Sequence, residues 1–336
     1  MELRMSSIPL MLAYVSSLAS RPGDPETVRR IIAHEDYQFE LRRYEIPSAE
    51  HLVDYFSRLN TIPPEEIPDL TEGRHKSGLR EKHEQWLDCV ANPQKYADRY
   101  ERLKALFTDD FLAEMQARLT AMFPGGTEMI SDPAIVSTLS FGRSFGYPHE
   151  GALHLDLFGI DQYASLEELP CIVLHEMHHL QMIKMAENLS GEESLLDRYL
   201  RGFAWEGLAV KFCNNAQGVI SRRIEPELPP NLGVPSIPLL NGHFPEHFRL
   251  FCDTVGWLRD GRFTEADLER QRREVWFNPY LYGEKPLDQL AVYSFGNDLY
   301  GCVYDHFGLE AVYECFYHPE RLIGYFNRSD CGWTIP

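Results

Sequence analysis

The chain has 336 residues, a formal net charge of −19, and 44% hydrophobic and 12% aromatic residues. This composition is typical of a globular protein and excludes general disorder, and the length allows one large domain or two lobes. The negative charge argues against nucleic acid or an anionic membrane surface as the principal partner. The seven cysteines are scattered and form no Cys-x-x-Cys pair, which favours free thiols in a reducing compartment. We therefore predict a cytoplasmic protein.

Residues 1–123 are predicted to form a helical N-terminal lobe. The apolar segment from Ile8 to Ala19 is interpreted as an amphipathic helix and not a signal peptide, because Glu2 precedes it and Ser16 and Ser17 interrupt it. Proline-containing breaks separate the remaining helices of the lobe, to which we assign a structural role. These helices are expected at residues 25–34, 37–44, 49–59, within 79–106 as one long helix, and at 109–122.

The break at Pro124-Gly125-Gly126 opens a second region, residues 124–336, that starts with β-prone sequence. Residues 134–139 and 152–158 are predicted to be two strands joined by a longer loop. In the second strand, leucines alternate with His154 and Asp156, which we interpret as solvent-side residues outside any site. The expected fold class is mainly α (α+β), with a small β-sheet and helical N- and C-terminal lobes.

His175, Glu176 and His179 have the spacing His-Glu-x-x-His. Two histidines four residues apart lie on one helix face and can share a metal ion, and the glutamate can take a proton from bound water. Apolar residues on both sides indicate a largely buried helix that begins between Ser165 and Pro170. A polar cluster in a buried helix is costly unless a partner satisfies it. Coincidence and a hydrogen-bonded core histidine are the alternatives, and the second explains two histidines with a glutamate between them poorly.

A catalytic zinc ion normally has three protein ligands and keeps one position for water. Met182 and Met185 occupy the places of the glycine and histidine that metzincins require, which excludes that class. On the next helix, Glu206 is the only charge on an apolar face, so we predict it as the third ligand. The alternative is a carboxylate paired with an arginine of the same helix, Arg198 or Arg201.

This second helix is expected to start near Gly191 and to end at about Cys213. Its small residues Gly202, Gly207 and Ala209 would allow another helix to approach closely.

Beyond this helix, residues 226–238 are proline-rich and predicted to form a surface loop. The remaining helices are expected at residues 245–258, 264–273, 287–307 with Gly308 as C-cap, 309–317 and 319–326.

His175-Glu176-x-x-His179, followed by Trp205-Glu206-Gly207-Leu208-Ala209, resembles the gluzincin clan of zinc metallopeptidases. More narrowly, it is similar to bacterial families described as zinc-dependent proteases, which also show a late Tyr-x-x-Gly helix and a closing aromatic segment. Here these are Tyr293-Ser294-Phe295-Gly296 and residues 323–327. The resemblance implies a zincin-like catalytic region over residues 124–336, with an edge strand that holds an extended peptide and Tyr293 as the donor to the oxyanion.

The chain departs from the thermolysin-like pattern in one place, because Val210 stands where that clan has an aspartate four residues after the third ligand. The Gly-x-Met-Glu-Asn signature of gluzincin aminopeptidases is also missing.

The sequence thus predicts a zinc metallopeptidase in which His175, His179 and Glu206 hold Zn²⁺ and Glu176 is the general base. Its expected partner is a peptide or protein substrate, with no nucleic acid and no membrane. A non-catalytic zinc scaffold remains an alternative, closed by a fourth ligand such as a cysteine or His178, although we expect His178 at an unremarkable surface position. A zinc hydrolase of a non-peptide amide is the other alternative. For Tyr293, a core position is about as plausible as a catalytic one.

Overall fold

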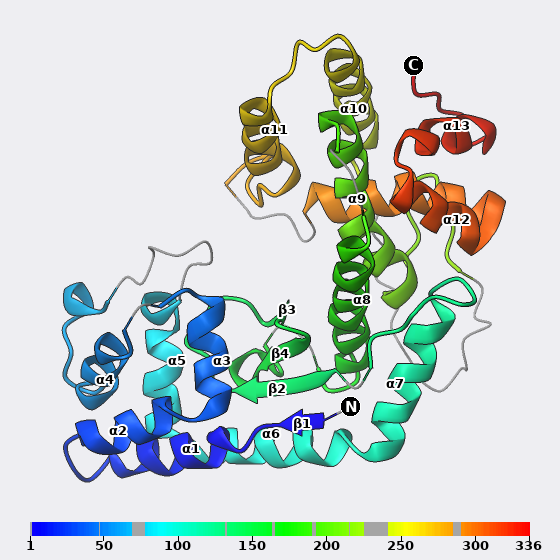
Figure 1. Ribbon diagram of the computed structural model, residues 1–336. Helices are drawn as coiled ribbons and strands as arrows, with labels where there is room; N and C mark the ends of the chain where they lie inside the picture. Colours follow the sequence, from blue (N-terminus) through cyan, green and yellow to red (C-terminus); the bar gives the residue numbers. More distant parts are fainter. Residues whose placement is uncertain are drawn as a thin grey trace. The chain divides into compact units, whose positions relative to one another are not determined.

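The computed structural model describes residues 2–46, 48–68, 78–131, 133–162, 165–189, 193–214, 216–224, 241–284 and 290–336. Over these residues the chain is mainly helical with one small mixed sheet, which agrees with the expected α+β class (Figure 1). The chain divides into two compact units. Unit 1 comprises Met1–Met115 and Ile130–Leu169, and unit 2 comprises Gln116–Met129 and Pro170–Pro336.

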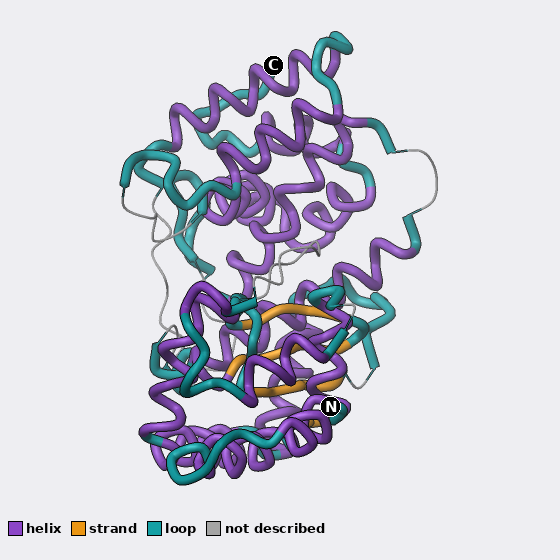
Figure 2. The backbone as a smooth tube through the Cα atoms, turned by 90° about the vertical axis from the view of Figure 1, so that its left-hand side faces the viewer, coloured by secondary structure: helices purple, strands orange, loops and turns teal. Residues whose placement is uncertain are grey.

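In unit 1, the described strands form one sheet in the order β1-β2-β4-β3, and helices surround it (Figure 2). Strands β1 and β2 pair in parallel, as do β2 and β4, whereas β3 runs antiparallel to β4. The bounds of the elements in this unit are β1 Glu2–Arg4, α1 Ser7–Ser17, α2 Pro25–Ile32, α3 Glu35–Arg43, α4 Glu50–Ser57, the 3₁₀ helix Pro64–Glu66, α5 Leu79–Ala91, α6 Pro93–Leu106, β2 Ala134–Thr138, β3 Gly146–His149, β4 Ala152–Asp156 and the 3₁₀ helix Leu157–Gly159. Helix α7, Asp109–Ala121, crosses from unit 1 into unit 2.

Most predicted helices of the N-terminal part are present, with one difference. The long helix expected within residues 79–106 is two helices, because Asn92 ends α5 and Pro93 opens α6. Proline suits the first turn of a helix but removes a hydrogen bond from a helix interior, so the chain breaks there. The sheet also has two strands more than predicted, since β1 and β3 join it. The compact units place this sheet with the N-terminal helices, unlike the predicted boundary at residue 123.

His154 and Asp156 are fully buried in unit 1, so their prediction as solvent-side residues was wrong. They lie on β4, which is an inner strand covered by helices and not an edge. Asp156 pairs with Lys82 of α5 and accepts hydrogen bonds from the backbone amides of Ser140 and Phe158. A polar side chain can point into a core when such partners replace water.

Glu40 of α3 belongs to the same buried network. Its carboxylate accepts hydrogen bonds from the Thr138 and Ser140 hydroxyls, and His154 Nε2 lies 3.6 Å away. Burial raises the pKa of Glu40 to about 8 and lowers the pKa of His154 well below its ordinary value. A protonated Glu40 and a neutral His154 therefore share this core.

In unit 2, α9 and α12 pack backbone to backbone at a pair of glycines. A Cβ atom on Gly207 would lie 2.3 Å from the carbonyl carbon of Gly296, whereas one on Gly202 would meet nothing within 4 Å. The close approach predicted from small residues therefore occurs at Gly207 and not at Gly202. The helices of this unit are α8 Leu169–Glu187, which begins at the boundary, α9 Leu195–Cys213, α10 Phe244–Arg259, α11 Glu265–Gln271 with the π-helical turn Arg272–Trp276, α12 Ala291–Tyr317 and α13 Glu320–Arg328.

Two helix boundaries in unit 2 differ from those predicted. Helix α9 starts at Leu195 and not near Gly191, because Ser194 is its N-cap and accepts a hydrogen bond from the Asp197 amide. The two helices predicted on either side of Gly308 form one helix, α12. Gly308 has φ 78° and kinks this helix at the position where the sequence predicted a break. The predicted loop at 226–238 lies outside the described residues.

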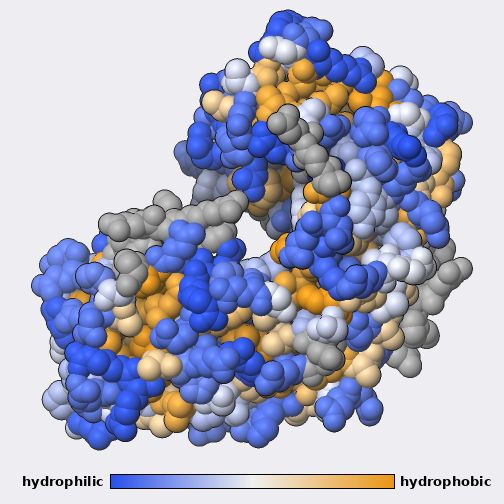
Figure 3. Space-filling model, in the orientation of Figure 1, coloured by the Kyte–Doolittle hydropathy of each residue, from blue (hydrophilic) through white to orange (hydrophobic). Residues whose placement is uncertain are grey.

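Hydrophilic side chains cover most of the face shown in Figure 3, as expected for a chain with a net charge of −19. Among the described residues, no helix is both long enough and apolar enough to cross a membrane.

Candidate metal centre

Helix α8 begins where the sequence predicted, between Ser165 and Pro170. The Glu168 carboxylate accepts hydrogen bonds from the Ser165 amide and hydroxyl at 2.7 and 2.9 Å, which holds the chain just before the first turn. The helix then places His175 and His179 one turn apart on one face, with ring centroids 4.6 Å apart.

Glu206 of α9 faces these two histidines. Its Oε2 atom lies 3.3 Å from His175 Nε2 and 3.2 Å from His179 Nε2, and the two Nε2 atoms are 2.9 Å apart. In the part of the chain that the structure describes, these three residues are the one group of three or more His, Cys, Asp or Glu side chains that could hold a metal ion. The structure thus brings together the three side chains predicted as ligands.

The arginines that offered an alternative partner for Glu206 are engaged elsewhere. Arg198 pairs with Glu265 at 2.7 Å, and Arg201 pairs with Glu193 and donates to the Phe316 carbonyl oxygen at 2.7 Å. Glu206 Oε2 is buried between the two imidazoles, 3.3 Å from His175 Nε2 and 3.2 Å from His179 Nε2. A buried carboxylate oxygen in this state is costly unless a cation completes its surroundings.

The spacing of the three atoms suits a tetrahedral zinc ion. Zinc ligands at about 2.0–2.1 Å from the ion would be separated from one another by about 3.3–3.4 Å in a regular tetrahedron. The observed separations of 2.9, 3.2 and 3.3 Å form a triangle close to one face of it. Two imidazole nitrogens and one carboxylate oxygen are also a donor set that zinc accepts.

The second ring nitrogen of His175 has its own partner, Asn214, which follows α9. His175 Nδ1 lies 3.4 Å from Asn214 Oδ1, and an Nδ1–H that donates to this oxygen leaves the Nε2 lone pair for a metal. Asn214 stands eight residues after Glu206 and thus two turns along α9. The sequence did not predict a role for Asn214, whose position at the C-cap of α9 was the available signal.

Electrostatics favour an ionised Glu206. Burial alone would raise its pKa, but the charges of His179 and His175 and hydrogen bonding to them more than compensate, and hold its pKa well below the ordinary value. The site is therefore anionic at its carboxylate, as a cation ligand must be.

Tyr293, at the start of α12, lies beside the cluster. Its ring stacks with that of His175 at a centroid distance of 6.1 Å. Burial raises the pKa of Tyr293 far above its ordinary value, and the negative charges of Glu206 and Glu176, with hydrogen bonding to Glu206, raise it further. Tyr293 therefore lies close enough to Glu206 and Glu176 to feel both negative charges.

His178 is not at the surface, so that expectation was wrong. It is fully buried and its Nε2 atom lies 3.1 Å from the Tyr313 hydroxyl. The ring of Phe123 stacks on it at 5.0 Å. Burial and the charges of His179 and His175 hold the pKa of His178 well below its ordinary value. His178 therefore packs on the face of α8 away from the ligands, and it cannot close the site as a fourth ligand in this arrangement.

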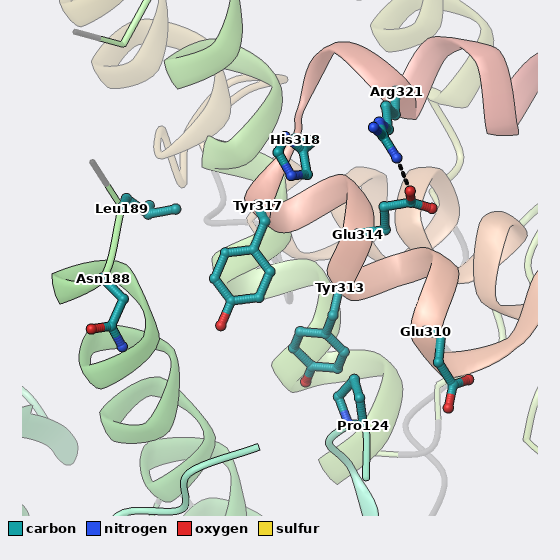
Figure 4. Close-up of a pocket in the computed structure, with 9 residues that line it drawn as sticks. All are labelled: Pro124, Asn188, Leu189, Glu310, Tyr313, Glu314, Tyr317, His318 and Arg321. Atoms are coloured by element: carbon teal, nitrogen blue, oxygen red, sulfur yellow. Dashed lines mark hydrogen bonds and ion pairs between the residues drawn. The ribbon is translucent and has the colours of Figure 1, made fainter. Parts of the chain in front are cut away.

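A separate hollow of about 540 Å³ lies between the end of α8 and the second half of α12 (Figure 4). The rings of Tyr313 and Tyr317 project into this region, whereas Arg321 and Glu314 pair with each other. Glu314 also accepts a hydrogen bond from Tyr325. The residues that line the hollow include none of the metal-ligand candidates.

Comparison with known proteins adds no assignment, since no protein-family model, curated protein or solved structure matches the chain.

Proposed function

We propose that the chain is a zinc-dependent metallopeptidase whose metal is held by His175, His179 and Glu206. The observation that carries the proposal is the convergence of His175 Nε2, His179 Nε2 and Glu206 Oε2, which lie within 3.3 Å of one another. The gluzincin resemblance supports the same ligand set.

When bound, zinc supplies a Lewis acid for the amide carbonyl and lowers the pKa of a water molecule. Glu176 follows His175 directly on α8 and takes the proton of the attacking water, then passes it to the leaving amine. Tyr293 donates a hydrogen bond to the oxygen that becomes negative in the transition state. Asn214 holds the His175 ring in the orientation that the metal requires.

The presence of a general base favours catalysis over a purely structural zinc site. A structural site is closed by four protein ligands and has no use for a base. Within the described residues, the cluster has three candidate ligands and His178 is turned to Tyr313.

The decisive experiment measures zinc per chain in the wild type, in Glu206→Gln and in Glu193→Gln. Glu193 is a matched control because it pairs with Arg201 and lies outside the cluster. We expect about one zinc per chain in the wild type and in Glu193→Gln, and a clear loss in Glu206→Gln. Unchanged zinc in Glu206→Gln would reject the third ligand, and a wild type that takes up no zinc would reject the proposal.

The enzymatic part is tested with a library of quenched fluorescent peptides and the variant Glu176→Gln. We expect cleavage by the wild type and none by Glu176→Gln, with equal zinc content in both. Bound zinc without any peptide cleavage would favour the non-catalytic scaffold or a hydrolase of another amide.

A further inference from the structure

The segment 216–224 follows α9 without regular secondary structure and is fastened to α12 by buried polar groups. Asp298 of α12 is fully buried, and its Oδ1 atom accepts hydrogen bonds from the backbone amides of Ile220 at 2.8 Å and Ser221 at 3.1 Å. The side chain of Asn297 also donates to the Ser221 hydroxyl oxygen at 3.0 Å. Two neighbouring amides of the segment therefore have the same carboxylate as their partner.

Gly218 allows the segment to approach this carboxylate closely. A Cβ atom on Gly218 would lie 2.0 Å from Asp298 Oδ1 and 2.7 Å from the Ser221 hydroxyl oxygen, so a larger residue does not fit there. The Gly218 amide also donates to the Ser221 carbonyl oxygen at 3.0 Å, which ties this stretch together. The backbone of the segment is thus fitted around the Asp298 carboxylate.

The start of the segment lies against the candidate metal centre. Asn214, two residues before the segment, is the partner of His175 Nδ1. Ala216 is fully buried and packs together with Val210 and Tyr293. A displacement of the segment would therefore move the backbone next to Asn214 and change the packing beside Tyr293.

We propose that Asp298 is a positioning residue of the metal centre, which holds the segment 216–224 on α12 and thereby keeps the Asn214 side chain behind His175. The inference rests on the proposed metal site. A buried carboxylate is costly unless strong donors replace water, and the two amides supply them. The buried Lys211 of α9 pairs with Asp305 at 2.9 Å, so backbone amides and not this cation occupy Asp298 Oδ1.

The first measurement needs no metal. Hydrogen exchange of the metal-free full chain is followed by mass spectrometry on peptides that cover the segment. We expect the Ile220 and Ser221 amides to exchange more than about tenfold faster in Asp298→Ala, because they lose a charged acceptor. Asp298→Asn keeps an acceptor oxygen and should exchange more slowly than Asp298→Ala. Tyr300→Phe is the matched control, because it removes a different buried hydrogen bond between α12 and α9 and should leave the segment unchanged.

The second measurement asks whether Asp298 acts through Asn214. Zinc affinity is determined by competitive titration for Asp298→Ala and Asn214→Ala, singly and combined. We expect Asp298→Ala to weaken zinc binding about three- to tenfold when Asn214 is present, and by less than about twofold in the Asn214→Ala background. Gly218→Ala, which displaces the segment while the carboxylate remains, should show the same dependence on Asn214. Tyr300→Phe should bind zinc as tightly as the wild type.

Unchanged hydrogen exchange or unchanged zinc affinity in a folded Asp298→Ala would overturn the proposal. Equal losses of affinity with and without the Asn214 side chain would also overturn it, because a general loss of stability acts in both backgrounds. If Asp298→Ala fails to fold, Gly218→Ala decides the question by the same two measurements. A wild type that takes up no zinc would reject the proposed function and the role at the metal, whereas the exchange experiment still shows whether Asp298 holds the segment.

Discussion

Replacement of Asn214 by alanine removes the side chain that orients His175, and it leaves the three candidate ligands in place. The loss of a partner behind a metal-ligating histidine typically lowers metal affinity about 10- to 100-fold. The 3.4 Å separation between His175 Nδ1 and Asn214 Oδ1 is longer than the usual range of about 2.7–3.2 Å. We therefore expect a loss near the lower limit, about tenfold or about 1.4 kcal/mol.

The substitution is well suited to this question because it spares the helix end. The Asn214 amide donates to the Val210 carbonyl oxygen at 3.1 Å, and this backbone bond remains when the side chain is shortened. Asn214→Asp offers the converse change, since a carboxylate accepts the same hydrogen bond more strongly. We expect Asn214→Asp to bind zinc at least as tightly as the wild type.

The assay is a competitive zinc titration of metal-stripped protein against a chromophoric chelator, with circular dichroism to show that each variant is folded. Asn188→Ala is the matched control, because Asn188 lies at the end of α8 beside the separate hollow. Wild-type affinity in Asn214→Ala, or weaker binding by a folded Asn214→Asp, would refute the assignment of Asn214 as the positioning residue.

Three further predictions concern activity, packing and pH. Tyr293→Phe should lower kcat about 100-fold on a cleaved peptide without loss of zinc, and an unchanged kcat would make Tyr293 a core tyrosine. Gly207→Ala should lower the free energy of unfolding, measured by chemical denaturation, by about 1–3 kcal/mol because the new Cβ atom meets Gly296. Gly202→Ala, whose Cβ atom meets nothing, should be neutral or stabilise the protein by up to about 1 kcal/mol. Equal effects of the two substitutions would contradict the close approach of α9 and α12 at Gly207. The folded chain keeps a proton on Glu40 up to about pH 8, while the unfolded chain releases it near the ordinary value of 4.5, so this group makes stability fall as pH rises between those values. The advantage of Glu40→Gln over the wild type in free energy of unfolding should therefore grow by about 3 kcal/mol from about pH 5 to about pH 8, and a pH-independent difference would show that Glu40 is ionised in the folded state.

The sequence alone determined those features that depend on local helical geometry. The i, i+4 spacing places His175 and His179 on one face wherever the helix lies, and a single carboxylate on an apolar face marks Glu206 as a residue that needs a cation or a donor. Both predictions use the period of one helix. Pro93 breaks the helix between α5 and α6 for an equally local reason, and was open to prediction.

Only the tertiary structure decided which element covers each face. Alternation in β4 shows that His154 and Asp156 share a side of the strand, but a helix 98 residues or more away in sequence brings Glu40 to the Thr138 and Ser140 hydroxyls on that side. In the same way, the burial of His178 depends on long-range packing, since its hydrogen-bond partner Tyr313 lies 135 residues later in the chain. Periodicity identifies which side chains lie on a common face, and whether water or a buried partner meets that face is set by long-range packing.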